Sequence, residues 1–210
     1  MMNRRTTVQS LAALAAAACM PLAAWAAEEA PDALIKRLSA DVLTTIKSDA
    51  ALKSGDIGKI SALVDQVVLP HVNFRRMTSA AVGPKWRQAT PEQQERLLTE
   101  FKQLLIRTYA GALAQVTDQT VVVKPLRMAA GDTDVLVRTE VRGKGEPVPL
   151  DFRLEKKDGG WKVYNFNVLG VWLVETYRTQ FAEELNKNGV EGLIQMLSSR
   201  SNLPAKAAGK

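Results

Sequence analysis

The stretch VYNFNVLGVWLVETYRTQF, Val163–Phe181, changes its hydrophobic period at Gly170. Before that glycine, aromatic and aliphatic residues alternate with asparagines, which is the pattern of a strand with one apolar face. The apolar members are Tyr164, Phe166 and Val168. After the glycine, Val171, Val174, Phe181 and Leu185 recur at helical spacing. The stretch therefore predicts a strand that turns sharply into a helix.

Three segments upstream share the period of two. They are QTVVVKPL (119–126), DTDVLVRTEVRG (132–143) and PVPLDFRLEKK (147–157), and the sequences GKGE and KDGG between and after the last two are typical of turns. Together with the strand before Gly170 they predict a four-stranded antiparallel meander. Its alternation of apolar and polar residues indicates that one face of the sheet is wet.

Helical periods flank the sheet. Residues 32–49 and 55–70 predict two helices, the second capped by Asp56, and residues 73–83 predict a third. A long helix is predicted after Thr90, where Pro91 and Gln93 complete a capping box. A last helix is expected over 190–199. The predicted fold class is α+β, a four-stranded antiparallel sheet with helices packed on one face.

The N-terminus has the features of a secretory leader. Arg4 and Arg5 precede a run of small apolar residues that ends in AWA, a good cleavage site. We expect residues 1–26 to be a signal peptide and residues 27–210 to form a single domain with a flexible C-terminal tail. Loss of Arg4 and Arg5 lowers the formal charge from +6 to +4, and an exported, modestly basic protein is an unlikely partner for nucleic acid. Beyond the leader, no run is long enough to span a membrane.

The sequence offers little for catalysis. The one histidine, His71, follows a helix-stopping proline, the one cysteine lies in the leader, and neither metal-ligand spacing nor a nucleotide-binding glycine loop occurs. Apolar stripes run along the predicted helices and strands, but periodicity does not separate a filled core from a lined cavity. An α+β cone enzyme acting on an apolar substrate, and a carrier of a hydrophobic ligand, both remain open at this point.

Two long segments carry a resemblance to a known family. They are LVDQVVLPHVNFRRMTSAAVGPKWRQATPEQQERLLTEFKQLLIRTYAGAL (63–113) and WKVYNFNVLGVWLVETYRTQFAEELNKNGVEGLIQML (161–197), which resemble the MlaC family, also called the toluene-tolerance family. Trp172 stands where the family pattern has a small polar residue.

The resemblance implies a periplasmic carrier that is not an enzyme and needs no cofactor other than a bound phospholipid. Such a carrier shuttles glycerophospholipid between an outer-membrane lipoprotein complex and an inner-membrane ABC transporter with an MCE-domain subunit. Its acyl chains are expected in an apolar pocket between the sheet and the helices. A carrier of another hydrophobic ligand or of lipoproteins is the alternative.

Two sets of site residues follow from this resemblance and from the predicted faces. The wall of the lipid pocket is expected at Leu98, Phe101, Leu105, Tyr109, Val123, Val135, Val137, Val141, Leu150, Phe152, Tyr164, Phe166, Val168, Val171 and Val174. A basic cluster around one loop is expected to dock acidic partner surfaces, and comprises Arg75, Arg76, Lys85 and Arg87.

Overall fold

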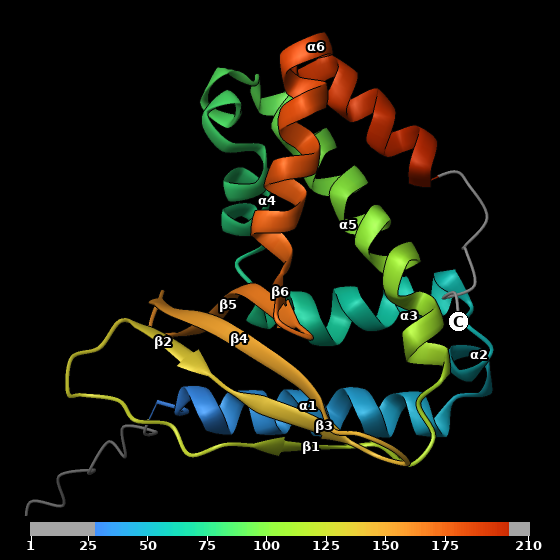
Figure 1. Ribbon diagram of the computed structural model, residues 1–210, viewed down its shortest axis with the longest axis vertical. Helices are drawn as coiled ribbons and strands as arrows, with labels where there is room; N and C mark the ends of the chain where they lie inside the picture. Colours follow the sequence, from blue (N-terminus) through green and yellow to red (C-terminus); the bar gives the residue numbers. More distant parts are fainter. Residues whose placement is uncertain (1–27, 202–210) are drawn as a thin grey trace, which may run out of the picture.

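A computed structural model describes residues 28–201 of the chain. The expected signal peptide and all of the expected tail except Ser201 lie outside these residues. Figure 1 shows a curved sheet with one helix along it at the bottom and a layer of helices standing above it. The α+β class and the antiparallel sheet predicted from the sequence are confirmed. No helix within residues 28–201 combines the length and the hydrophobicity that crossing a membrane would require.

Two helices, α3 (Ile57–Leu63) and α5 (Pro91–Ala114), begin at the capping residues that the sequence predicts. The described helical elements are α1 (Pro31–Ser48), α2 (Ala50–Lys53), α3 (Ile57–Leu63), α4 (Phe74–Val82), α5 (Pro91–Ala114) and α6 (Leu173–Ser201). The Asp56 side chain accepts a hydrogen bond from the Lys59 amide at the start of α3. Thr90 and Gln93 form the reciprocal capping box of α5, which satisfies amides that the first helical turn would leave without partners.

The segment after α3 departs from a regular helix. It continues as a π-helical turn, η1 (Val64–Val68), and a 3₁₀ turn, η2 (Leu69–His71). The proline at position 70 lies within η2, where it supplies no amide donor, and the helical run ends one residue later, at His71. The segment after α4, which carries Lys85 and Arg87 of the predicted basic cluster, is a further 3₁₀ turn, η3 (Gly83–Gln88).

The sheet is a meander with more breaks than the sequence predicts. Its strands are β1 (Thr120–Val123), β2 (Asp134–Val137), β3 (Thr139–Arg142), β4 (Val148–Lys157), β5 (Gly160–Val168) and β6 (Val171–Trp172). The predicted second strand is divided at Arg138 into β2 and β3, which pair with successive parts of β4. The short β6 folds back on the end of β5 before α6 begins.

Three apolar clusters hold these elements together. In the upper layer, α4, α5 and α6 pack around Phe101, Phe181 and Leu193. Beneath it, α1 packs through Leu34 and Ile35 on one face of the sheet. The third cluster joins the end of α1 to α2, α3 and α5.

The face of the sheet opposite α1 is more buried near β5 than the sequence predicts. Asn165 and Asn167 are both buried. The Asn165 side chain accepts a hydrogen bond from the Val174 amide at 3.1 Å and donates one to Glu175 at 2.7 Å. Asn165 therefore caps the first turn of α6 and fixes the angle at which this helix leaves the sheet.

Candidate binding site

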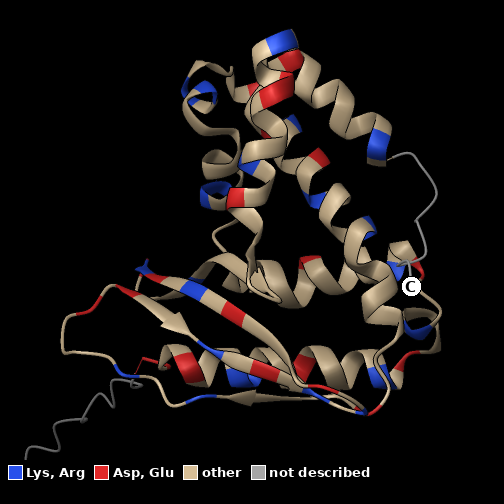
Figure 2. Ribbon diagram, viewed as in Figure 1, with Lys and Arg blue, Asp and Glu red and all other residues tan. Residues whose placement is uncertain are grey.

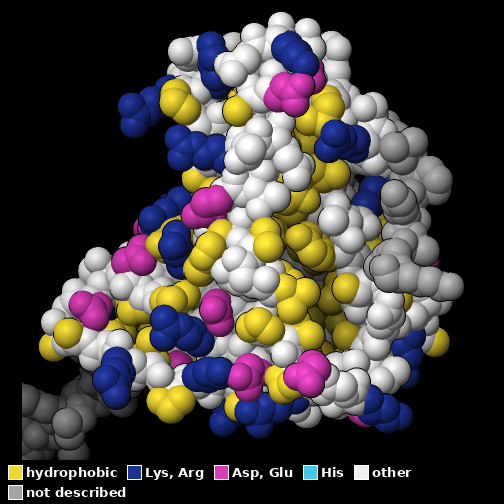
Figure 3. Space-filling view, in the orientation of Figure 1, with side chains coloured by type: hydrophobic (Ala, Val, Ile, Leu, Met, Phe, Trp, Pro, Cys, Tyr) yellow, Lys and Arg dark blue, Asp and Glu magenta, His cyan; other side chains and the backbone are white. Residues whose placement is uncertain are grey.

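An apolar pocket lies where the three clusters meet, between the sheet and the helices above it. Its volume is about 320 Å³, within the range of about 300–1,000 Å³ that ligand pockets occupy. Figure 3 shows apolar side chains gathered between the sheet and the upper helices, where the surface is hollowed. The lining residues are Ile60, Val64, Val68, Leu69, Val72, Phe74, Met77, Lys102, Leu105, Ile106, Tyr109, Leu113, Leu150, Phe152, Phe166, Val168 and Leu173.

Local geometry aims these side chains at one space. Leu105 and Tyr109 are four residues apart on α5 and therefore share a helix face. Leu150 and Phe152 share a face of β4 because they are two residues apart, and Phe166 pairs directly with Phe152 across the sheet. The rings of Phe152 and Phe166 meet edge to face with centroids 5.6 Å apart.

The lining is suited to binding an apolar chain rather than to catalysis. Among the lining residues only Lys102 is charged, and the buried environment of the Tyr109 hydroxyl raises its pKa. The described residues hold no group of His, Cys, Asp and Glu side chains able to bind a metal ion. His71 lies outside the lining, and burial lowers its pKa. The pocket can enclose a hydrocarbon chain and exclude water from it.

The structure brings six of the fifteen predicted wall residues into this lining. They are Leu105, Tyr109, Leu150, Phe152, Phe166 and Val168. All six come from α5, β4 and β5, the elements whose periodicity in the sequence is clearest.

Of the nine other predicted wall residues, four belong to packed clusters instead: Phe101, Val123, Val135 and Val137. Phe101 is a centre of the upper cluster, and Val135 and Val137 are buried between the sheet and α1. The prediction that Val137 faces a cavity is corrected here, because its side chain is fully enclosed by the α1 cluster. Those that lie outside the lining are Leu98, Phe101, Val123, Val135, Val137, Val141, Tyr164, Val171 and Val174.

A β-bulge explains the position of Tyr164. The pairing of β4 with β5 shifts between Arg153 and Leu154, so that Val163 rather than Tyr164 pairs with Leu154. The Tyr164 hydroxyl donates to Asp134, and the Arg76 guanidinium lies 3.5 Å from the centre of its ring. Strict alternation, on which the sequence prediction rests, fails at this one residue.

The turn between β5 and β6 explains the position of Val171. Leu169 and Gly170 both have positive φ, 54° and 85°, as in the tight hairpin turns that join antiparallel strands. Val171, directly after them, is 53% exposed. Helical spacing placed it on the apolar face of α6, but that helix begins only at Leu173.

The pocket wall formed by residues before α5 is not among the residues predicted from the sequence. Val64, Val68, Phe74 and Met77 line the pocket from η1 and α4. Val64 and Val68 lie in the π-helical turn, whose five-residue hydrogen-bond spacing differs from the period that identifies an α-helix. The resemblance covers this segment, so its match to the family pattern is the signal that could have directed attention to it.

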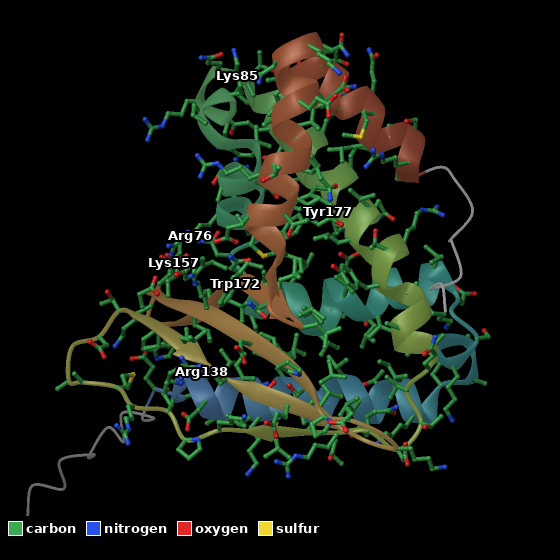
Figure 4. All side chains as sticks on the ribbon, in the orientation of Figure 1. Arg76, Lys85, Arg138, Lys157, Trp172 and Tyr177 are labelled. Carbon is green, nitrogen blue, oxygen red and sulfur yellow. The ribbon has the colours of Figure 1, made fainter. Side chains whose placement is uncertain are left out.

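The four predicted docking residues do not form one patch. Figure 4 shows Arg76 beside the sheet and Lys85 near the far end of the upper layer. Arg76 is paired with Glu155 and lies 3.7 Å from Asp134, and Arg75 is paired with Glu95. Within residues 28–201, Lys85 and Arg87 take part in no ion pair.

Trp172 is held on the outside of the pocket region. It belongs to β6 and is only partly buried, and the Arg153 guanidinium lies 4.2 Å from the centre of its ring. Arg153 also pairs with Glu175 at 3.3 Å. The tryptophan therefore packs against charged groups of β4 and α6 and does not line the apolar pocket.

Comparison with known proteins assigns this chain to a family. The family model described as MlaC protein matches residues 36–199. The chain belongs to the MlaC family. The resemblance seen in the sequence is thus confirmed over most of the chain.

Two named relatives match the chain at about one quarter sequence identity. The chain is 25% identical over 182 residues to the intermembrane phospholipid transport system binding protein MlaC of Haemophilus influenzae, covering 85% of both proteins. It is 26% identical over 173 residues to toluene tolerance protein Ttg2D of Pseudomonas putida, covering 82% of this chain and 80% of that relative.

A solved structure is more similar to this chain than these two relatives are. The phospholipid-binding protein of Ralstonia solanacearum, determined in complex with a phospholipid, is 52% identical and superposes with a TM-score of 0.79. The match covers 83% of this chain and 97% of that protein.

Proposed function

We propose that this MlaC-family protein is a periplasmic carrier that holds the acyl chains of a glycerophospholipid in the apolar pocket. The observation that carries the proposal is this apolar pocket. It lies in a chain whose sequence is 52% identical to that of a protein solved in complex with a phospholipid. The proposed wall comprises the lining residues of α5, β4 and β5 together with those of η1 and α4. MlaC-family proteins are lipid-binding carriers without enzymatic activity, so no reaction is proposed here.

The energetics explain why such a carrier is needed. A lipid with two tails of ordinary length has about 30 methylenes, each worth about 0.8 kcal/mol on transfer out of water, so bare passage costs about 25 kcal/mol. An apolar pocket removes the share of this cost that belongs to the methylenes it encloses. The carrier must still release its lipid, so its affinity has to remain comparable to that of the donor and acceptor.

We further propose that the lipid is exchanged between an outer-membrane lipoprotein complex and an inner-membrane ABC transporter with an MCE-domain subunit. The name of the Haemophilus relative, an intermembrane phospholipid transport binding protein, supports this proposal. The chain itself shows no nucleotide-binding glycine loop. The direction of transport would therefore be set by an ATP-using partner.

The first test is extraction of the protein after purification from a periplasm. Mass spectrometry of the organic extract should find about one glycerophospholipid per protein, with mixed head groups. A protein that extracts clean, and that takes up no phospholipid from vesicles, would falsify the carrier function.

The second test separates the pocket wall from the packed core. Leu105 faces the pocket and is partly exposed, so water can hydrate a glutamate there once the lipid has left. Leu105→Glu should fold and carry little phospholipid. Val137→Glu should instead unfold or fail to accumulate, because an unpaired buried carboxylate costs several kcal/mol of a total stability of about 5–15 kcal/mol.

The matched control is Thr99→Glu, which adds the same charge to the exposed side of α5. It should fold and remain loaded. Circular dichroism and thermal melting report folding, and extraction reports loading. A folded Leu105→Glu variant with normal phospholipid content would remove this residue from the proposed wall.

A further inference from the structure

One charged side chain stands at the edge of the apolar pocket. Lys102 lies on α5 one turn before Leu105 and Ile106, and it alone among the lining residues carries a charge. Its side chain is 23% exposed. A lysine in this position covers apolar surface with its methylenes and holds its ammonium group at the water boundary.

The ammonium group of Lys102 has one anionic partner among the described residues. Its Nζ donates to Asp65 Oδ1 at 2.7 Å. Asp65 belongs to the π-helical turn η1, whose Val64 and Val68 line the same pocket. Single π-helical turns occur frequently at functional sites. The ion pair therefore joins two walls of the pocket at its rim.

A phospholipid would present a second anion at this rim. Its tails need the apolar lining, so its phosphodiester comes to rest where that lining meets water. The phosphodiester and the Asp65 carboxylate each carry one negative charge at neutral pH, and lysine binds phosphate as a point charge. The Asp65 side chain is 43% exposed, so it can exchange its ion pair for water at little cost.

We propose that Lys102 binds the phosphate of the carried lipid, and that the phosphate displaces Asp65 from the ammonium group. This inference rests on the phospholipid-carrier function proposed above. It assigns specificity to a single rim residue: the pocket selects tails, and Lys102 selects two-tailed lipids that carry a phosphate over neutral ones of the same tail length.

Competition between two lipids tests the assignment. The protein is incubated with vesicles that contain equal amounts of phosphatidylethanolamine and diacylglycerol with identical acyl chains, repurified and extracted. Wild-type protein should favour the phospholipid. Lys102→Met keeps the length of the side chain and should lower the ratio of phospholipid to diacylglycerol by about threefold to tenfold, as expected for loss of one charge-assisted contact at a partly wet site.

Three variants separate this contact from general charge. Lys59→Met removes the same charge from an exposed position of α3 outside the pocket and should keep the wild-type ratio. Lys102→Arg retains the charge and should keep the wild-type preference for phospholipid. Asp65→Asn removes the competing carboxylate and should raise the ratio.

Two measurements of the lipid ratio in the wild-type protein test the proposal without any variant. Raising the salt concentration should lower the ratio, because exposed charges are screened. Inorganic phosphate at millimolar concentration should not lower it, which distinguishes a lipid head group from a free-phosphate site.

Four results would overturn the assignment to Lys102. They are an unchanged ratio in Lys102→Met, an equal fall in Lys59→Met, a wild-type ratio that salt does not alter, and displacement by inorganic phosphate. Uptake of neither lipid by the wild-type protein is a different failure, because it contradicts the carrier function itself.

Discussion

At the scale of single residues, Tyr164 shows how one bulge redirects a side chain. The shift in pairing between β4 and β5 removes it from the apolar face and places its hydroxyl against Asp134 and its ring against Arg76. Burial is the largest cause that raises the pKa of Tyr164 to about 12, and the hydrogen bond to Asp134 adds to it.

This pKa predicts a loss of stability in alkali. The phenol titrates at about 10 in an unfolded chain, so the folded state holds its proton more tightly. The resulting stabilisation is fully present below pH 10 and is lost as the pH rises through about 12. Between these values, the free energy of unfolding measured with urea should fall more steeply in the wild type than in Tyr164→Phe.

Absorbance titration offers an independent check. Burial raises the pKa of the other two tyrosines, Tyr109 and Tyr177, as well, so no phenol of the folded protein should titrate at its ordinary value. A wild-type step near pH 10 that disappears in Tyr164→Phe would contradict the prediction.

At the scale of elements, α6 depends on one glycine. Gly189 interrupts the helix with φ 67° and ψ −164°, a conformation that is essentially restricted to glycine. Figure 1 shows that the two halves of α6 meet at a sharp turn at the top of the upper layer. The turn lets Leu193 and Leu197 reach the cluster that Phe181 enters from the other half.

Gly189→Ala should therefore destabilise the protein through its backbone alone. A Cβ at this position would have no atom within 4 Å, so the expected cost of about 1–3 kcal/mol is conformational. It should lower Tm by several degrees, at about 2–4 °C per kcal/mol for a chain of this size. Gly160→Ala is the control, because it also meets nothing within 4 Å but has φ outside the left-handed region. Equal Tm values for the two variants would refute the role of Gly189.

The elements also show which parts of the fold are predictable from sequence. The start of α5, the cap of α3 and the order of the strands follow from local rules: side chains that satisfy free amides, and apolar residues at period two or 3.6. The division of the second strand at Arg138 and the π-helical turn do not. The division follows from the pairing of β2 and β3 with successive parts of β4, and the π-helical turn departs from the period of 3.6, so no local pattern records either of them.

At the scale of the whole molecule, the pocket exists because three clusters meet without filling the space between them. Phe166 packs against both the upper cluster and the α1 cluster, and Ile106 belongs to the third, yet all face the same hollow. Val137 and Phe152 occupy neighbouring strands with the same periodicity, but only Phe152 reaches the hollow. Periodicity identifies the apolar face, but it does not separate a residue such as Val137, enclosed in the cluster with α1, from one such as Phe152, which also borders the pocket.

The charge distribution of the whole molecule refines the docking proposal. Figure 2 shows Lys and Arg residues on α4 and on the η3 turn. Arg75 and Arg76 are neutralised by partners, whereas Lys85 and Arg87 lie on η3 beside a shallow hollow lined by Trp86 and Arg178. Among these four described residues, the charges left for an acidic partner surface therefore lie on η3.

We expect a double variant, Lys85→Glu with Arg87→Glu, to weaken binding to the proposed MCE-domain partner at low salt while the bound phospholipid is retained. Long-range attraction between exposed charges sets the association rate, so the loss should appear mainly there and shrink as salt rises. Reversal of Arg76 is a poorer test, because it also breaks the contacts with Glu155 and Tyr164. Lys53→Glu with Lys59→Glu makes the same charge change on exposed positions of α2 and α3. If surface plasmon resonance finds equal weakening in both double variants, net charge rather than η3 attracts the partner, and the docking site has to be sought on another face.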